Sequence, residues 1–278
     1  MSDWFVSTEW LAEHLKKPDV AVVDASWYLP TAGRDAQAEY LAGHLPGAVF
    51  FDIDAIADRT TTLPHMLPTP PDFAKMVGRL GIGDAMTIVV YDEAGLFSAP
   101  RVRWTFLAMG ARDVKILAGG GAKWRKEGRP IETGPVARTP AHFAARLDPA
   151  AVVDFATVDR RRHDHETNIV DARPAPRFTG KEAEPRPGLK SGHIPGSFNV
   201  PSGELVAADG QMKPAAQLRK IFAEAGVDLQ APLITSCGSG ITAAVVALGL
   251  EIAGARDVAV YDGSWAEWGA RPGAAIER

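Results

Sequence analysis

Cysteine is the scarcest chemically informative residue in this chain of 278 residues, which contains one. A single thiol excludes an internal disulfide and fits a reducing compartment, so the expected location is cytoplasmic. Acidic residues number 34 against 30 lysines and arginines, and without a long basic run a nucleic-acid partner is not expected. No apolar stretch reaches membrane-spanning length, so no membrane association is expected either. The first residues have neither the basic region nor the apolar core of a signal peptide.

Several binding motifs are missing as well. The sequence contains no P-loop and no dinucleotide-binding fingerprint, and no cofactor is therefore expected. His163 and His165 flank Asp164, but no further ligands with suitable spacing accompany them, so no metal site is expected. What is present is an apolar fraction of 46% beside 23% charged residues, which supplies a substantial core. A chain of this length suits two domains of ordinary size.

The order of segments in the first half recurs in the second half. Three landmarks repeat: Val22 to Ser26 with Asn168 to Arg173, Gly43 to Ala48 with Gly192 to Ser197, and Gly110 to Gly120 with Gly254 to Ser264. Their offsets are 147, 149 and 144 residues, and so nearly constant a spacing indicates a duplicated domain.

Each half alternates apolar runs of strand length with helical runs. Val20 to Ala25 and Met86 to Asp92 are examples of the strand-like runs. The alternation predicts an α/β fold, in which each domain contains a mainly parallel sheet with helices on both faces. We expect domains over 1–130 and 151–278, joined by a linker over 131–150 that is rich in Pro, Gly, Thr and Ala. In such sheets the ligand site lies beyond the carboxyl ends of the strands.

The single cysteine lies where such a site is expected. The apolar run Leu233 to Ser236 leads to Cys237, which begins a tight turn with two glycines, and the helix-forming run Thr242 to Leu250 follows. A cysteine there would face backbone N–H groups that have no helical partner, an environment that stabilises an anionic sulfur. The alternative is a small buried core residue, and position alone does not separate the two.

The duplication shows that the two halves differ at this turn. The first half has Asp92 where the second half has Cys237, and its turn is one residue longer when counted to Ala99 against Ala243. Thiol chemistry is therefore confined to the second half.

With these residues the chain resembles the two-domain rhodanese sulfurtransferases over essentially its full length, and most nearly the members that use 3-mercaptopyruvate. The motifs that carry the resemblance are Asp24 to Pro30, His65 to Pro68, Ser98 to Val102, Cys237 to Ala243, and Tyr261 to Trp265. Relatives that use thiosulfate typically carry basic side chains where this chain has Gly238 and Ser239. Ile241 replaces a more usual valine.

The resemblance implies two tandem rhodanese-like domains, of which the first is inactive, and a ping-pong sulfur transfer. The thiolate of Cys237 takes the sulfur of 3-mercaptopyruvate as a persulfide and releases pyruvate. A thiol acceptor such as thioredoxin, or cyanide, then receives that sulfur. The loop residues expected around the sulfur and the substrate are Gly238, Gly240, Ile241 and Thr242. Thiosulfate as the donor, or a non-catalytic persulfide-carrier module, are the alternatives.

The resemblance also implies a proton relay of Ser239, His44 and Asp35, because the enolate of pyruvate leaves the donor and must be protonated. Each residue has a structural alternative. Ser239 precedes a helix and would serve as its cap. His44 has a twin, His193, in the same Gly-His-hydrophobic-Pro-Gly turn, which favours a structural role for both.

Two arginines are candidates for binding the carboxylate of a keto acid. Arg177 and Arg186 lie nine residues apart in a stretch whose prolines and glycines predict a loop, not a helix. The guanidinium group suits a carboxylate, and the resemblance favours this clamp. The alternative is a pair of surface ion pairs with Glu182 and Glu184, which would contribute little.

Other residues are assigned to structure. Arg101 and Arg103 are read as surface or domain-interface charges, His65 as a residue that shapes the cleft, and Trp265 and Trp268 as core or cleft wall. A phosphatase is excluded, because the arginine that its loop needs near its end is replaced by Ala243 and Ala244. An internally duplicated chain is compatible with a monomer.

Overall fold

The computed structural model describes residues 4–164 and 166–278, which form two compact units. Unit 1 comprises Met1–Asp58, Leu67–Asp148 and Ala208–Gln211. Unit 2 comprises Arg59–Met66, Pro149–Ala207 and Met212–Arg278. Each unit therefore takes one short segment from the other half of the sequence, namely 208–211 in unit 1 and 59–66 in unit 2.

Unit 1 contains a parallel five-stranded sheet in the order β1-β5-β4-β2-β3. Its elements are β1 (Phe5–Val6), α1 (Thr8–His14), β2 (Val20–Asp24), a 3₁₀ turn (Pro30–Ala32), α2 (Ala36–Ala42), β3 (Val49–Phe50), α3 (Pro70–Arg79), β4 (Thr87–Tyr91), α4 (Ala99–Ala108), β5 (Asp113–Leu117) and α5 (Gly120–Lys126). The predicted strands at Val20 to Ala25 and Met86 to Asp92 thus form β2 and β4, which pair with each other at the centre of the sheet.

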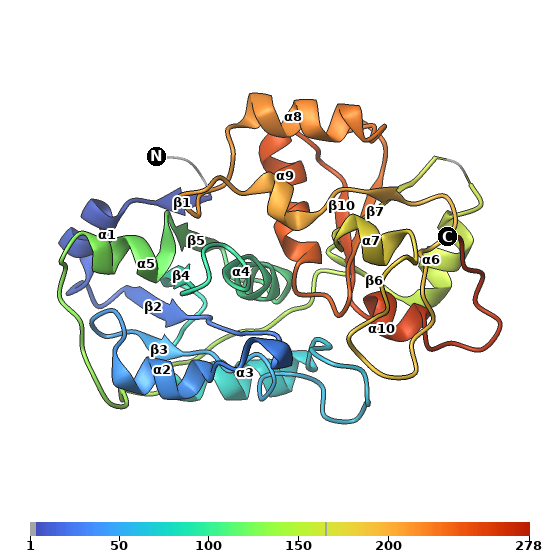
Figure 1. The fold of residues 1–278 in the computed structure, drawn as a ribbon. Coiled ribbons are helices and arrows are strands. Elements are labelled where there is room, and N and C mark those ends of the chain that lie inside the picture. The colour runs from blue at the N-terminus through green and yellow to red at the C-terminus, as the bar shows by residue number, and fades with distance from the viewer. Residues whose placement is uncertain (1–3, 165) are drawn as a thin grey trace. The chain divides into compact units, whose positions relative to one another are not determined.

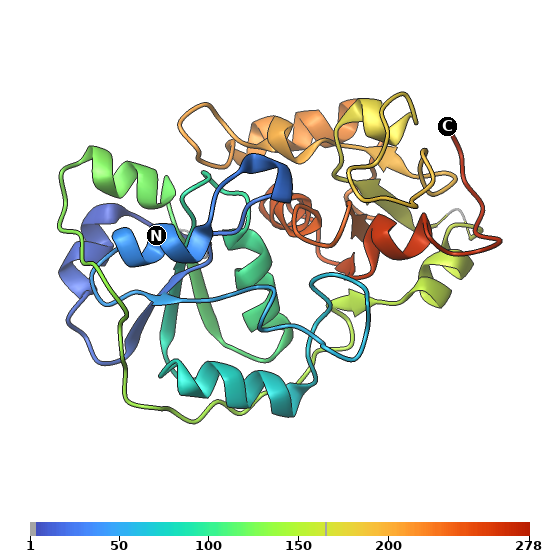
Figure 2. The ribbon, with the colours of Figure 1, turned by 60° about the horizontal axis from the view of Figure 1, so that its bottom comes forward.

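Helices cover both faces of this sheet (Figures 1 and 2). Alternate side chains of each strand point to opposite faces, so both faces present side chains to a layer of helices. On one face, Leu11 of α1 and Trp124 of α5 share a buried cluster with Val22 of β2. Phe73 of α3 and Phe106 of α4 pack edge to face, with ring centroids 5.4 Å apart, in the core of the unit. The central strands β2 and β4 are buried on both sides and are accordingly mostly apolar, as parallel strands are.

Unit 2 repeats this topology with the order β6-β10-β9-β7-β8, again all parallel. Its elements are β6 (Val152–Val153), α6 (Phe155–Arg161), β7 (Asn168–Asp171), α7 (Ala175–Phe178), β8 (Phe198–Asn199), a 3₁₀ turn (Ser202–Leu205), α8 (Ala215–Glu224), β9 (Leu233–Ser236), α9 (Ala243–Ala253), β10 (Val258–Tyr261) and α10 (Ser264–Trp268). Strand for strand, β6, β7, β8, β9 and β10 occupy the places of β1, β2, β3, β4 and β5. The predicted duplication and fold class are confirmed.

Cys237 lies in the loop that leads into helix α9, which is the most deeply buried helix of unit 2. It packs on α8 (Figure 1), where a Cβ on Gly249 would meet Leu205 at 2.9 Å and Phe222 at 3.5 Å. On another side of the unit, Trp265 and Trp268 of α10 join a buried cluster with Val158 of α6, so both tryptophans are core residues as expected. Within the described residues, no helix combines the length and apolar character needed to cross a membrane.

The predicted linker over 131–150 differs from what the structure shows, because most of it packs on unit 1. Glu132 forms an antiparallel bridge with His44, as Glu277 does with His193 in unit 2. The indole of Trp124 donates to the Pro130 carbonyl at 2.8 Å, and that of Trp268 donates to the Ala275 carbonyl at the same distance. The residues just after 130 are therefore the closing segment of the first repeat. Their Pro- and Gly-rich composition indicates irregular backbone but does not show where that backbone packs.

Candidate active site

Cys237 immediately follows β9 and begins the loop that leads into α9, as the sequence predicts. The side chain is buried, with 2% of the residue exposed. The backbone N–H of Gly240 donates to Sγ at 3.1 Å, and Gly240 adopts φ 82°, a left-handed conformation that favours glycine. We call residues 237–243 the Cys237 loop and residues 92–99 of unit 1 the Asp92 loop.

The Asp92 loop shows what the backbone of such a loop can bind. The carboxylate of Asp92 accepts five backbone N–H bonds, at 2.8–3.1 Å, from Ala94, Leu96, Phe97, Ser98 and Ala99. Counted back from the start of each helix, the donors Phe97 and Ser98 correspond to Ile241 and Thr242. The loop is therefore an anion cradle made of main-chain donors.

In the Cys237 loop one main-chain donor, the N–H of Gly240, contacts a sulfur atom. Among the described residues, the N–H groups of Ser239, Ile241 and Thr242 donate to no protein acceptor. Ser239 is 5% exposed, and its hydroxyl also makes no hydrogen bond within the described part of the chain. Ser239 does not cap α9, whose N-cap residue is Thr242. Donors of this kind stabilise negative charge on Sγ or on a second sulfur attached to it.

The turn that follows β10 forms hydrogen bonds that support the Cys237 loop. The N–H of Cys237 donates to Oγ of Ser264 at 3.2 Å, and that hydroxyl donates to the Tyr261 carbonyl at 2.8 Å. The N–H of Trp265 donates to the Cys237 carbonyl at 2.9 Å. Ser264 adopts φ 49°, which is uncommon for a residue with a side chain and is maintained here by its hydrogen bonds.

The structure brings both predicted arginines to the Cys237 loop. A Cβ atom built on Gly238 would lie 3.0 Å from Nη2 of Arg177 and 4.0 Å from Nη1 of Arg186. Arg177 lies on the one-turn helix α7, so the predicted loop is wrong at this residue. Arg186 also contacts His65, with Nη2 3.4 Å from Nε2. Two guanidinium groups thus lie beside the residue that follows the cysteine.

Arg177 is held by a buried network of charges. Glu184, whose side chain is 1% exposed, accepts from Nε and Nη2 of Arg177 and, at 2.7 Å, from Nη1 of Arg173. Arg173 also donates to Asp171 and lies over the ring of Trp265, 4.3 Å from its centroid. Burial alone would lower the pKa of Arg173, but the Asp171 and Glu184 carboxylates outweigh it and raise that pKa. The alternative of a surface ion pair between Arg177 and Glu184 is therefore wrong, because the Glu184 side chain is buried.

The predicted Asp35–His44 contact does not form in the described structure. The carboxylate of Asp35 caps α2 by accepting the Ala38 N–H at 3.0 Å. The ring of His44 is buried, with Nδ1 2.9 Å from the Leu45 carbonyl and Nε2 3.0 Å from the Gly134 carbonyl. Among the described residues, the hydrogen-bond partners of both side chains are main-chain groups. The Asp35 carboxylate caps α2 and both ring nitrogens of His44 contact carbonyl groups, and these are the groups that the relay would need.

His193 confirms the structural reading of this histidine turn. Its Nδ1 lies 2.8 Å from the Phe178 carbonyl, and its ring stacks on Phe178 at 3.7 Å between centroids. His44 stacks in the same way on Tyr40, at 4.3 Å. Because both units bury the histidine against an aromatic ring and a carbonyl, the turn explains why both sequences carry it.

Arg101 and Arg103 are buried, so of the two alternatives given for them, surface charge and domain-interface charge, the first is wrong. Arg101 lies over Trp104, 4.5 Å from the ring centroid, and Nε of Arg103 donates to the Val114 carbonyl at 3.3 Å. His65 is buried in unit 2 and adopts φ 62°. These arginines use their aliphatic stems as apolar surface while the guanidinium groups find partners.

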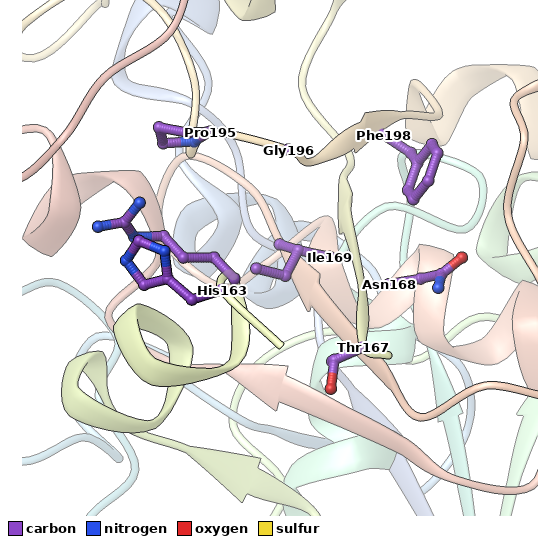
Figure 3. A pocket seen from close by; sticks show the side chains of 8 residues that line it. His163, Thr167, Asn168, Ile169, Pro195, Gly196 and Phe198 are labelled. Atoms are coloured by element: carbon purple, nitrogen blue, oxygen red, sulfur yellow. The ribbon is translucent and has the colours of Figure 1, made fainter. Parts of the chain in front are cut away.

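Unit 2 has a further pocket of about 340 Å³ (Figure 3). Its lining includes His163, Asn168 and Phe198, at the amino ends of β7 and β8. Cys237 follows the carboxyl end of β9, so the pocket lies at the opposite edge of the parallel sheet. His165 lies outside the described residues, and no group of three or more potential metal ligands occurs among those described.

Asp171, Arg173, Glu184 and Ser264 form part of the site but were not predicted. The repeat contained a signal for two of them. Arg173 stands where the first half has Ser26, and Ser264 stands where the first half has Gly120. A side chain that replaces a small residue at a repeated landmark indicates a contact that one unit makes and the other lacks. Glu184 had no such signal, because its burial depends on packing in three dimensions.

Comparisons with known proteins agree with this arrangement. The family model for the rhodanese-like domain matches residues 7–127 and 154–271. A 3-mercaptopyruvate sulfurtransferase of Escherichia coli (strain K12) is 46% identical over 275 residues, covering 99% of this chain and 98% of the relative. A thiosulfate sulfurtransferase of Cricetulus griseus is 44% identical over 270 residues, covering 95% and 91%.

Solved structures include SseA from Escherichia coli, described as a 3-mercaptopyruvate sulfotransferase with the rhodanese fold. It matches with a TM-score of 0.88 and 44% identity, over 95% of this chain and 99% of SseA. Each matched range of the family model contains four of the five strands of one repeated sheet, and the second range contains the only cysteine. The chain therefore belongs to the rhodanese family and contains two rhodanese-like domains.

Proposed function

We propose that the protein is a sulfurtransferase that moves the sulfur of 3-mercaptopyruvate through a persulfide on Cys237 to a thiol acceptor or cyanide. The observation that carries the proposal is the position of Arg177 and Arg186 beside Gly238, next to the only thiol. A donor with a carboxylate near its sulfur suits such a pair of guanidinium groups. The similarity to the E. coli 3-mercaptopyruvate sulfurtransferase supports the same donor.

In the first step the thiolate of Cys237 attacks the sulfur of 3-mercaptopyruvate. The Sγ–S bond forms, the S–CH₂ bond breaks, and its electron pair leaves with the carbon as the enolate of pyruvate. Arg177 and Arg186 hold the carboxylate, while the N–H groups of Gly240, Ile241 and Thr242 stabilise the anionic sulfur. The product on the enzyme is Cys–S–SH.

The enolate must take a proton to become pyruvate. The Ser239 hydroxyl is the group in the loop that is suited to pass this proton or to bond the carbonyl oxygen of the donor. A relay through His44 and Asp35 draws no support from their contacts, which are with main-chain groups of unit 1. In our proposal Ser239 therefore acts with solvent.

In the second step an acceptor thiolate attacks the outer sulfur of the persulfide and Cys237 leaves as a thiolate, so the enzyme returns to its starting state. A small protein dithiol of the thioredoxin type is a suitable acceptor, and cyanide serves in an assay. Because Cys237 must return to a free thiolate after each cycle, a reducing setting such as the cytoplasm fits the reaction.

Thiosulfate is the second candidate donor, favoured by the similarity to the thiosulfate sulfurtransferase of Cricetulus griseus. It is a dianion without a carboxylate and would gain from cations in the loop, where this chain has the neutral residues Gly238 and Ser239. The double variant Gly238→Arg with Ser239→Lys should shift the ratio of the two kcat/KM values toward thiosulfate. An unchanged ratio contradicts this reasoning about loop charge.

The test is turnover with both donors in parallel, with pyruvate and sulfite measured as products and cyanide as acceptor. The proposal expects stoichiometric pyruvate and a higher kcat/KM for 3-mercaptopyruvate than for thiosulfate. Thiocyanate without pyruvate would contradict the proposed donor. Neither product, from a folded protein, would favour a persulfide carrier.

A further inference from the structure

Glu184 lies at the centre of the charges behind the Cys237 loop. Its two oxygens accept from two different arginines, and Arg177 contributes both Nε and Nη2 to that contact. Of the two arginines, Arg177 is the one that reaches Gly238, whereas Arg173 is 1% exposed in its side chain. Among the described residues Nη1 of Arg177 makes no hydrogen bond, so Glu184, by binding Nε and Nη2, fixes which edge of this guanidinium remains for a ligand.

The network also balances its own charge. Asp171 and Glu184 each carry a formal negative charge, and Arg173 and Arg177 each carry a positive one. All four lie within one chain of contacts, which includes salt bridges of 2.6 Å between Asp171 and Arg173 and of 2.7 Å between Arg173 and Glu184. In a buried environment such charges interact more strongly than in water, so removing one changes the field at the loop.

We propose that Glu184 is a specificity-determining residue that favours the keto-acid donor over a dianionic donor. It acts through Arg177 and does not touch the reacting atoms, so it is a positioning residue. Its first effect is to orient the guanidinium for a planar carboxylate, which thiosulfate lacks. Its second effect is to cancel one positive charge, which would otherwise attract a dianion about twice as strongly as a monoanion. This inference rests on the proposed function.

The two effects predict changes of opposite sign in Glu184→Gln. The kcat/KM for 3-mercaptopyruvate should fall about 10-fold, mainly through KM, because Arg177 loses its ionic partner. The kcat/KM for thiosulfate should stay level or rise, because the site gains a net positive charge. The ratio of the two values should therefore move at least about 10-fold toward thiosulfate. A general loss of structure would lower both values together.

Glu182→Gln is the matched control, because Glu182 is an exposed carboxylate two residues away on the same segment. It removes the same formal charge from the chain and should leave both donors unchanged. Glu184→Asp separates position from charge, because a shorter carboxylate keeps the charge and does not span both arginines. It should weaken 3-mercaptopyruvate without improving thiosulfate.

Parallel kinetics of these variants, with thermal unfolding to confirm the fold, decide the matter. Equal changes for both donors in Glu184→Gln, or no change, overturn the inference. If that variant does not fold, Glu184→Asp carries the test, and a wild-type KM for 3-mercaptopyruvate overturns it. A wild-type protein that fails to release pyruvate refutes the proposed function instead, so the two failures are distinguishable.

Discussion

The Asp92 loop and the Cys237 loop are two versions of one structural solution. Each follows the central strand of a five-stranded parallel sheet and leads into a buried helix. Each also has a glycine with positive φ three residues after its first residue, Gly95 at 77° and Gly240 at 82°. In unit 1 the loop donates five N–H bonds to its own aspartate. In unit 2 one N–H reaches the cysteine sulfur among the described residues.

The difference between the loops shows how one backbone can serve stability or chemistry. A carboxylate that is part of the chain satisfies the donors permanently, and the loop becomes rigid structure. A cysteine side chain is shorter than an aspartate and ends in one weak acceptor instead of two oxygens. It therefore leaves N–H donors for charge that develops during a reaction. The next residue completes the contrast: Glu93 follows Asp92 and pairs with Arg125, whereas Gly238 has no side chain and admits Arg177.

The largest expected effect is on the stability of unit 1. Asp92→Ala removes the acceptor of five buried N–H groups, and we expect the free energy of unfolding to fall by about 3 kcal/mol or more. Asp92→Asn keeps one acceptor oxygen and should cost roughly half as much. Urea denaturation measures both. A loss below about 1 kcal/mol for Asp92→Ala would mean that the carboxylate is not the anchor of this loop.

The second effect concerns the arginines that only unit 2 brings to its loop. Arg177→Lys should raise KM for 3-mercaptopyruvate about 30-fold, or about 2 kcal/mol, because an ammonium group does not replace the guanidinium fork. Arg160→Lys, on the exposed face of α6, is the control and should have the wild-type KM. Steady-state kinetics of pyruvate release provide the measurement. An unchanged KM in Arg177→Lys would remove this residue from the carboxylate site.

A smaller effect on KM is expected from adding a side chain at Gly238, the residue after the cysteine. In Gly238→Ala the new Cβ meets Nη2 of Arg177 at 3.0 Å, which is tight, and Glu184 restrains the guanidinium from moving away. KM should rise about 5-fold with little change in kcat. Gly203→Ala is the matched control, because nothing lies within 4 Å of its Cβ position. Identical KM values in the two variants would show that Arg177 yields freely.

The smallest effect is expected for His44 and His193, whose replacement should change stability but not turnover. His44→Gln and His193→Gln should each lower the free energy of unfolding by about 1 kcal/mol, since each ring packs on an aromatic ring and a carbonyl. Turnover per folded molecule should stay within about twofold of wild type in both. If turnover falls more than about 10-fold in His44→Gln alone, the relay through His44 operates after all.

The sequence predicted the fold through its repetition, because a constant offset between landmarks does not depend on knowing any contact. The place of Cys237 followed from the same comparison. Glu184 entered the sequence analysis only as a partner in the alternative of surface ion pairs, because a carboxylate flanked by prolines and glycines has no periodicity that indicates burial. Glu132 and Glu277 were missed for a related reason, since each bridges to a histidine more than 80 residues away in sequence. Such contacts are set by tertiary packing, which local composition does not encode.

Arg177 and Arg186 show a middle case. Their residue type and the resemblance indicated a carboxylate clamp, and the structure places both guanidinium groups beside Gly238. The local conformation of Arg177 was wrong, because α7 is a single turn that begins directly after Pro174, too short for a helical pattern to be recognised. The chemistry of a side chain was thus easier to infer than the backbone that carries it.

The most direct test is the mass of the protein after incubation with 3-mercaptopyruvate and removal of excess donor. The wild-type chain should gain one sulfur atom, located on the peptide that contains Cys237, with one equivalent of pyruvate released. Cys237→Ser should gain none and release none, while Asp92→Asn should still form the persulfide. Sulfur that appears without pyruvate, or that persists in Cys237→Ser, would contradict the account.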